Sequence, residues 1–237
     1  MKLEDLSIKI FADGADLDDM LRLYENEYIQ GFTTNPTLMR KAGITDYETF
    51  ARSVLERIQD RPISFEVFSD DFDEMVAQAR LIRSWGDNVY VKIPVTNTKG
   101  ESSVAIVEQL SGEGVQLNVT AVFTPEQVRA MSAALKNGAP SVVSVFAGRI
   151  ADAGIDPMPI MSEALNILRD TPSAELLWAS PREVFNVVQA DQVGCHIITA
   201  TSGILSKLST LGKNLDEFSL DTVKMFYNDA QSAAYRI

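Results

Sequence analysis

The feature that most constrains the fold is a regular alternation of short apolar segments with stretches of helical periodicity. The apolar segments are rich in β-branched residues and are predicted strands, covering residues 7–13, 31–35, 63–68, 89–95, 115–123, 141–148, 175–180 and 195–200. Between them, apolar residues recur at helical spacing, as in Phe50, Val54 and Ile58, which indicates helices with one face packed on a sheet. Eight strands alternating with helices in 237 residues predict an α/β fold, a single (β/α)8 TIM barrel.

A doubly wound open sheet is the main alternative fold. It would usually have fewer strands and a glycine-rich first turn, and no GxGxxG or GxxxxGK[ST] segment supports a nucleotide cofactor. No linker or internal repeat divides residues 1–214, which are expected to form the barrel as one domain. Residues 215–237 are predicted to add a C-terminal helix that carries the apolar residues Phe218, Val223 and Phe226. This tail could cover its own barrel or reach a neighbouring subunit, and the sequence leaves both open.

Composition argues against several classes of partner. The net charge of −12 disfavours nucleic acid and anionic membrane surfaces. Cys195 is the only cysteine, so an intrachain disulfide is impossible and a reducing compartment is favoured. The first residues lack the apolar stretch of a signal peptide, and no segment approaches the length of a membrane span. We therefore expect a soluble, cytoplasmic protein that binds neither nucleic acid nor membrane.

The single histidine, His196, narrows the possible chemistry further. A zinc site built from several histidines cannot form, and no cysteine cluster replaces them. A Ser-His-Asp triad would have to use His196 itself, which lies at the entry to the predicted strand 195–200. A structural role is the simpler interpretation there. No metal and no organic cofactor is expected.

Lys92 is the most informative single residue, because it interrupts the apolar predicted strand 89–95. A charged lysine rarely enters such a strand without a partner or a function. Burial disfavours the ammonium form, so a lysine at this place can serve as an amine nucleophile, the chemistry of a Schiff-base enzyme. A plain buried ion pair is the alternative interpretation. Lys9 shares the inward parity of Asp13, but it lies near the start of its strand, at the end of a barrel associated with stability.

Other polar side chains lie where the predicted strands end, which is where a (β/α)8 barrel carries its chemistry. Besides Lys92, this set comprises Asp13, Thr34, Asn35, Glu66, Asn118, Thr120, Ser144, Arg149, Ser180 and Arg182. Single members have simple structural explanations: Asp13 can cap the next helix, and Asn35 before Pro36 can be turn chemistry. Taken together, however, two carboxylates, a lysine, amide and hydroxyl groups and two arginines are expected to converge on one rim.

These residues resemble the motifs of the transaldolases, in particular the short group related to bacterial fructose-6-phosphate aldolase. The resemblance runs from Asp13 to about Leu208. Its markers are Thr-Asn-Pro at 34–36, Val-Lys-Ile-Pro-Val-Thr at 91–96, Asn-Val-Thr at 118–120, Ser-Val-Phe-Ala-Gly-Arg at 144–149 and Ala-Ser-Pro-Arg at 179–182.

The resemblance implies a role for each residue. Lys92 is expected to attack the ketose carbonyl, and Asp13 to take the proton from the C4 hydroxyl so that the C3–C4 bond breaks. Glu66 and Thr120 are similar to the pair that holds a catalytic water. The implied substrate-binding residues are Asn35, Asn118 and Ser144 around the dihydroxyacetone unit, Arg149, Ser180 and Arg182 around the phosphate, and in addition Thr34 and Phe146. An iminium at C2 is itself an electron sink, so this chemistry needs no cofactor.

Two positions favour transfer of the dihydroxyacetone unit over its release. Glu66 stands where the aldolase group tends to carry glutamine, and Phe146 stands where it carries a tyrosine thought to protonate the enamine. The expected enzyme is therefore a transaldolase of the pentose phosphate type, with fructose 6-phosphate or sedoheptulose 7-phosphate as donor and an aldose phosphate as acceptor. Short members commonly form pentamers or decamers with the C-terminal helix crossing to a neighbour, so a homo-oligomer is expected.

Some departures from the family pattern keep alternatives open. Gly14 replaces the usual threonine or serine, Pro181 replaces an aromatic residue, and Thr201-Ser202 stands where a proline is common. They leave a variant substrate such as a sulfonated ketose as one alternative. Aldolase-type cleavage that releases free dihydroxyacetone is a second, separate alternative. The third is an inert barrel that binds sugar phosphates without turning them over.

Overall fold

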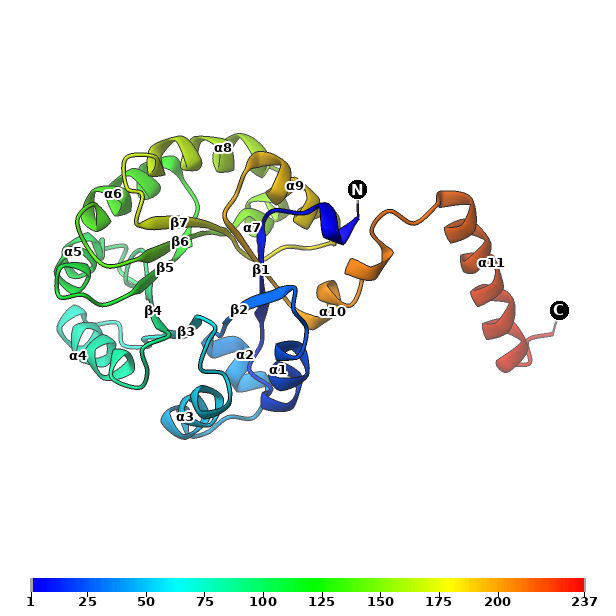
Figure 1. The fold of residues 1–237 in the computed structure, drawn as a ribbon, viewed down its shortest axis with the longest axis horizontal. Coiled ribbons are helices and arrows are strands. Elements are labelled where there is room, and N and C mark those ends of the chain that lie inside the picture. The colour runs from blue at the N-terminus through cyan, green and yellow to red at the C-terminus, as the bar shows by residue number, and fades with distance from the viewer. Residues whose placement is uncertain (1, 237) are drawn as a thin grey trace.

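The eight apolar segments pair side by side, in chain order, into a closed parallel barrel (Figure 1). This arrangement comes from a computed structural model that describes residues 2–236. The strands are β1 (Lys9–Asp13), β2 (Ile29–Thr33), β3 (Ile63–Glu66), β4 (Val89–Pro94), β5 (Leu117–Val122), β6 (Ser141–Val145), β7 (Ala174–Trp178) and β8 (Ile197–Ala200). The predicted (β/α)8 barrel is confirmed, and the open doubly wound sheet is excluded because β1 pairs with both β2 and β8.

Helices follow the strands and form the outer layer of the barrel (Figure 1). They are α1 (Leu17–Tyr24), α2 (Pro36–Lys41), α3 (Tyr47–Arg57), α4 (Phe72–Arg83), α5 (Val104–Gly112), α6 (Pro125–Leu135), α7 (Ala147–Asp152), α8 (Pro157–Leu168), α9 (Phe185–Val193), α10 (Ser202–Leu205) and α11 (Leu215–Ser232), with 3-10 turns η1 (Leu3–Asp5) and η2 (Leu208–Thr210). Short polar side chains start many of them: Asp16, Asp46 and Asp71 each accept a hydrogen bond from a backbone N–H in the first turn. Such caps satisfy N–H groups that have no partner within the helix.

Alternating side chains give the strands two buried faces. The outward face packs on the helices through residues such as Phe65 and Trp178, both fully buried. The inward face near the strand starts forms a separate apolar cluster that includes Phe11, Leu177 and Ile197. Gly31 leaves room for this cluster, since a Cβ there would lie 2.5 Å from the ring of Phe11. This apolar cluster fills the interior between the Lys9–Glu175 ion pair at the strand starts and the polar residues at the carboxyl ends of the strands.

Six of the eight strands end one to three residues earlier than predicted, and the ends of the second and sixth strands bear on the site. The second strand was expected at 31–35 but ends at Thr33, because Asn35 caps α2 by accepting from the N–H of Leu38. The sixth was expected at 141–148 but ends at Val145, because α7 begins two residues later. In both cases the motif bridges the strand and the following helix.

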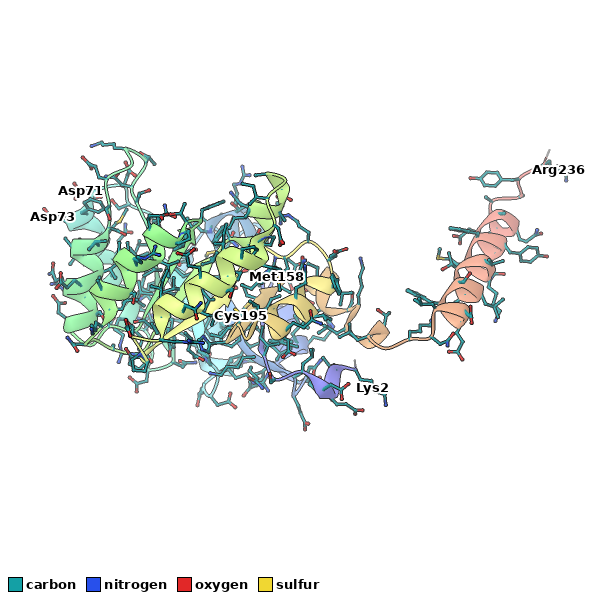
Figure 2. The ribbon with its side chains drawn as sticks, turned by 90° about the horizontal axis from the view of Figure 1, so that it is seen from above. Lys2, Asp71, Asp73, Met158, Cys195 and Arg236 are labelled. Atoms are coloured by element: carbon teal, nitrogen blue, oxygen red, sulfur yellow. The ribbon has the colours of Figure 1, made fainter. Side chains whose placement is uncertain are left out.

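The last helix, α11, lies apart from the barrel (Figures 1 and 2). None of its described residues is buried, and Phe218, Val223 and Phe226 are all exposed. An isolated chain would not normally present so many apolar side chains to water on one helix. Between residues 2 and 236, no helix combines the length and the apolar character needed to cross a lipid bilayer.

Candidate active site

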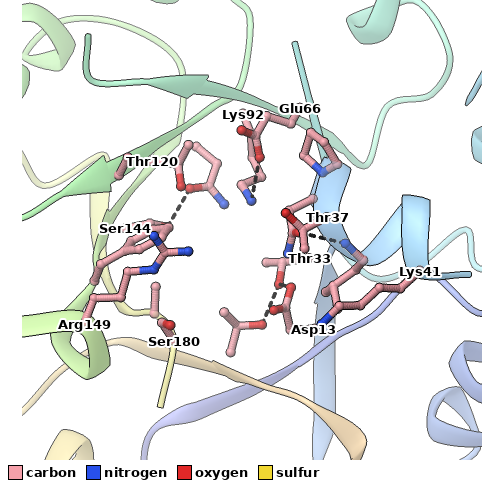
Figure 3. A pocket seen from close by; sticks show the side chains of 18 of the residues that line it. Asp13, Thr33, Thr37, Lys41, Glu66, Lys92, Thr120, Ser144, Arg149 and Ser180 are labelled. Carbon is pink, nitrogen blue, oxygen red and sulfur yellow. Dashed lines mark hydrogen bonds and ion pairs between the residues drawn. The ribbon is translucent and has the colours of Figure 1, made fainter. Parts of the chain in front are cut away.

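A cavity of about 550 Å³ opens at the carboxyl ends of the strands. It is lined by almost the whole predicted set, namely Asp13, Asn35, Glu66, Lys92, Asn118, Thr120, Ser144, Phe146, Arg149, Ser180 and Arg182. Figure 3 shows Lys92 and Glu66 on one wall, with Arg149 and Ser180 across the cavity from Asp13. The closed barrel thus brings together residues that are far apart in the sequence, as expected from their positions at the strand ends.

Strand register places Lys92 between two polar neighbours. Glu66 of β3 pairs with Lys92 of β4, which pairs in turn with Asn118 of β5. Lys92 is only 6% exposed; its Nζ lies 3.1 Å from Oε2 of Glu66 and donates a 2.8 Å hydrogen bond to the carbonyl oxygen of Thr34. The ion pair considered as an alternative is thus present, and the same geometry holds the amine at the cavity wall.

Asp13 ends β1 and faces the same cavity. Burial raises the pKa of its carboxyl group, while the positive charge of Lys92 and a hydrogen bond from Thr33 act in the opposite direction. Oγ1 of Thr33 donates to Oδ1 of Asp13 at 2.8 Å. A carboxylate whose pKa is raised is a better proton acceptor than an ordinary surface aspartate.

The hydroxyl and amide groups of β5 and β6 form a connected row. Oγ of Ser144 donates to Oδ1 of Asn118 at 2.6 Å, and Nδ2 of Asn118 donates to Oγ of Ser64 at 2.9 Å. Thr120 differs, since its buried hydroxyl has no hydrogen-bond partner in the described part of the chain. A buried hydroxyl at a cavity wall without a protein partner is available to a water molecule or a ligand.

Two arginines make the far side of the cavity positive. Arg182 forms an ion pair with Asp152, and its Nη1 donates to Oγ of Ser180 at 3.0 Å. The guanidinium of Arg149 stacks over the ring of Phe146, 5.5 Å from its centroid. Guanidinium groups held in this way offer fixed donors to a phosphate or sulfonate.

Thr34 is the one predicted site residue that does not line the cavity. Its side chain is fully buried and donates a 2.8 Å hydrogen bond to the carbonyl oxygen of Ser64. Only its main-chain carbonyl, the acceptor for Lys92, points toward the site chemistry. Side chains alternate along β2, so Thr33 faces into the barrel on the same side as Gly31, and Thr34 faces outward.

Four further polar residues line the cavity that were not predicted as site residues: Thr33, Thr37, Lys41 and Thr199. Thr199 lies near the end of β8, so the same strand-end rule extended to the last strand would have found it. Thr33 has the same parity as Asn35 in the predicted strand 31–35, so strand alternation would have found it. Lys41 sits at the end of α2, where the sequence gives no sign that the helix returns to the rim.

The two residues set aside in the sequence lie away from this cavity. Nδ1 of His196 accepts a 2.8 Å hydrogen bond from the backbone N–H of Leu176. Lys9 forms an ion pair with Glu175 at the other end of the barrel, at 2.8 Å. Both contacts are structural in kind.

Comparison with known proteins agrees with the motifs. A family model described as Transaldolase/Fructose-6-phosphate aldolase matches residues 10–237. The chain belongs to this family. A "Probable transaldolase" of Nitrosopumilus maritimus is 36% identical over 203 residues, which cover 85% of this chain and 87% of that protein. A "Probable transaldolase" of Streptococcus equi subsp. zooepidemicus is also 36% identical, with 85% and 90% covered. The family and these names indicate a transaldolase-type enzyme.

Solved structures at low identity share the fold of this family member. A dihydrodipicolinate synthase from Rhodopseudomonas palustris superposes with a TM-score of 0.62 at 14% identity, covering 97% of this chain and 81% of that one. A putative phosphonomutase from Burkholderia cenocepacia gives a TM-score of 0.55 at 13% identity, covering 89% and 94%. At such identities the likeness extends to the barrel alone.

Proposed function

We propose that this protein is a transaldolase that transfers a dihydroxyacetone unit from a ketose phosphate to an aldose phosphate through a Schiff base on Lys92. The observation that carries the proposal is the placement of one buried amine and two carboxylates, Asp13 and Glu66, on a single cavity. A primary amine, a nearby proton acceptor and a second base are the groups that class I aldol chemistry requires.

Formation of the Schiff base needs an amine with a free lone pair. Glu66, 3.1 Å from the amine, is placed to accept a proton from Lys92, which can then attack C2 of the ketose. The C2 oxygen must leave as water, which needs further proton transfers. The unpartnered hydroxyl of Thr120 and the carboxyl of Glu66 can hold the water that relays them.

Cleavage needs a base for the hydroxyl on C4. Asp13 takes this proton, the C3–C4 bond breaks, and its electron pair passes to the iminium to give an enamine while the aldose leaves. An acceptor aldose then reacts by the reverse sequence, in which Asp13 returns the proton. With C2 of the donor bound to Lys92 and its terminal phosphate at Arg149 and Arg182, C4 lies between these two anchors, in the cavity that Asp13 lines.

The direct test of this mechanism is reductive trapping. Borohydride added with fructose 6-phosphate should leave a covalent adduct on Lys92, located by peptide mass spectrometry. Lys92→Met should abolish transfer and trapping and keep the folded circular dichroism spectrum. Lys9→Met is the matched control, because Lys9 is the inward-parity lysine at the opposite end of the barrel, and it should keep both activities. An adduct on another lysine, or none, would contradict the assignment.

Aldolase-type release of free dihydroxyacetone is the second candidate function. Phe146, which lines the cavity without any acidic group of its own, disfavours it, because release requires protonation of the enamine. Incubation with fructose 6-phosphate alone should therefore give little dihydroxyacetone, and erythrose 4-phosphate should restore turnover. Full cleavage without an acceptor would instead assign the aldolase reaction. A sulfonated ketose belongs in the same assay, since paired guanidinium groups bind either anion.

We propose further that the enzyme is cytoplasmic and works as a homo-oligomer, a pentamer or decamer, in which α11 packs on a neighbouring subunit. The exposed apolar side chains of α11 and its separation from the barrel support assembly (Figure 2). The single cysteine, which is free and buried, fits a reducing compartment. Sedimentation at micromolar concentration should show an assembly of several chains, and a monomer would contradict it.

A further inference from the structure

A line of hydroxyl groups leads from the last strand of the barrel to the proposed base. Oγ1 of Thr199, on β8, lies 2.6 Å from Oγ1 of Thr33, on β2. Oγ1 of Thr33 lies 2.8 Å from Oδ1 of Asp13, on the intervening strand β1. Both threonines line the cavity and are almost fully buried: Thr33 is 2% exposed and Thr199 is 5% exposed.

The number of hydrogens on the two hydroxyl groups decides which group donates in each hydrogen bond of this line. A threonine hydroxyl has one hydrogen to donate and two lone pairs to accept with. Thr33 uses its hydrogen on the carboxylate of Asp13, so the hydrogen between the two threonines must come from Thr199. Each donor is polarised by the next acceptor along the line, which strengthens the contact at the charged end.

We propose that Thr33 and Thr199 are positioning residues for Asp13, with the Thr199 hydroxyl orienting that of Thr33, which in turn stabilises and aims the Asp13 carboxylate for proton transfer. The proposal rests on the proposed function in that Asp13 is taken as the base of the cleavage step. It gives a role to two buried hydroxyls of the cavity that no other step of the proposed mechanism uses.

Two effects compete at Asp13. Burial raises the pKa of this carboxyl group, and the hydrogen bond from Thr33 lowers it. Without the hydroxyl line the carboxyl would keep its proton to a higher pH and lose its function as a base there. The hydrogen bond from Thr33 thus favours the ionised form of a buried carboxyl group without adding a further charge to the cavity.

Other charged groups face Asp13 and are left unchanged by substitutions in the threonines. Lys92 on β4 lowers the pKa of Asp13, and Glu66 on β3 raises it. Lys41 on α2, Arg149 on α7 and Arg182 before α9 also line the cavity. On the outer side, Asp19 of α1 contacts Arg22 and the hydroxyl of Ser202 on α10.

The test measures the pKa of Asp13 directly, by carbon-13 NMR of aspartate-labelled full-length protein, with the signal assigned by its loss in Asp13→Asn. Thr33→Val keeps the shape of the side chain and removes the hydroxyl, and it should raise the pKa of Asp13 by about one unit, the size expected for a hydrogen bond to a charged group. Thr199→Val should give a smaller rise. Thr33→Ser should restore the original value.

The matched control is Thr171→Val. Thr171 is as buried as Thr33 and bonds to the hydroxyl of Ser132 in the helical layer, far from the cavity. It should leave the Asp13 titration unchanged. If Thr33→Val fails to fold, Thr199→Val and Thr33→Ser still decide the question, because they change the donor and the geometry separately.

Activity gives a second readout. With Thr33→Val, the acidic limb of the pH profile of kcat/KM should move upward by the same amount as the titration, with the rate recovering at higher pH. A uniform loss at every pH with an unchanged pKa of Asp13 would overturn the proposal and leave a packing role. The titration needs no turnover, so absence of transaldolase activity would refute the proposed function while the titration still decides the role of the threonines.

Discussion

At the scale of single residues, burial explains both what could be predicted and what could not. Lys92 was found because a charged residue stands out in an apolar strand, and its low exposure bears this out. The ion pair with Glu66 depends on register between two strands, which no local pattern reveals. Thr33 and Thr34 are adjacent residues of the same type, and the alternation of side chains along β2 decides that Thr33 faces the site.

Asp13 should make the native protein less stable at neutral pH. Because burial raises its pKa above the unfolded value, the folded state binds this proton more tightly than the unfolded state does. The cost of ionisation is therefore absent below the unfolded pKa and fully present above the folded one. Asp13→Asn should raise the free energy of unfolding at neutral pH, with a gain that disappears near pH 3, measured by urea denaturation. A gain that grows as the pH falls would contradict this sign.

Cys195 should be inert in the native state. Burial raises the pKa of its thiol to about 12, so almost no thiolate is present at pH 8. A disulfide reagent such as Ellman's should label the chain only after unfolding by guanidinium chloride. Rapid stoichiometric labelling of the native protein would show that the β8 region opens easily.

At the scale of elements, the site depends on close contacts between neighbouring strand ends. Two non-glycine residues that line the cavity, Ala121 and Ser180, have positive φ angles of 58° and 61°. Ala121 lies where the β5–β6 register shifts, between Val119 and Val122. Such strain is held only by surrounding structure. The sequence predicted the strands, but it gave no sign of these local distortions.

Gly148 allows α7 to approach the loop after β7. A Cβ on this residue would lie 1.6 Å from the carbonyl oxygen of Ser180, so one of the two segments has to move. Gly148→Ala should therefore displace Ser180 and its contact with Arg182, raising KM for the anionic donor on the order of tenfold, as for loss of one charged hydrogen bond. Gly112→Ala, where a Cβ meets nothing within 4 Å, is the control and should leave KM unchanged in steady-state assays.

At the scale of the whole molecule, the distribution of charge and apolar surface sets how the protein meets its partners. The chain carries a net charge of −12, yet Lys41, Arg149 and Arg182 surround the mouth of the cavity. An anionic substrate is thus attracted locally against an unfavourable overall field. The apolar side chains of α11 are the opposite case, a surface whose exposure points to association.

Charges placed on α11 should dissociate the proposed assembly without unfolding the barrel. Val223 and Phe226 are 60% and 63% exposed, so their replacement removes no contact within the chain's own core. Val223→Asp combined with Phe226→Asp should shift the sedimentation coefficient toward that of a monomer and keep the melting temperature of the barrel within a few degrees. Thr222→Asp, on the same helix but polar already, serves as the control. An unchanged assembly would mean that subunits meet elsewhere.

The sequence by itself determined the class of this protein. Alternating apolar segments specify the eight strands, and because parallel strands present their carboxyl ends on one side, the strand-end residues from Asp13 to Arg182 had to share a rim. What only the tertiary structure decided is pairing: Lys92 with Glu66, Thr33 with Asp13 and Thr199, Gly148 against Ser180. The physical reason is that burial follows from the local pattern of one segment, whereas a hydrogen bond or close contact depends on the register and closure of the whole barrel.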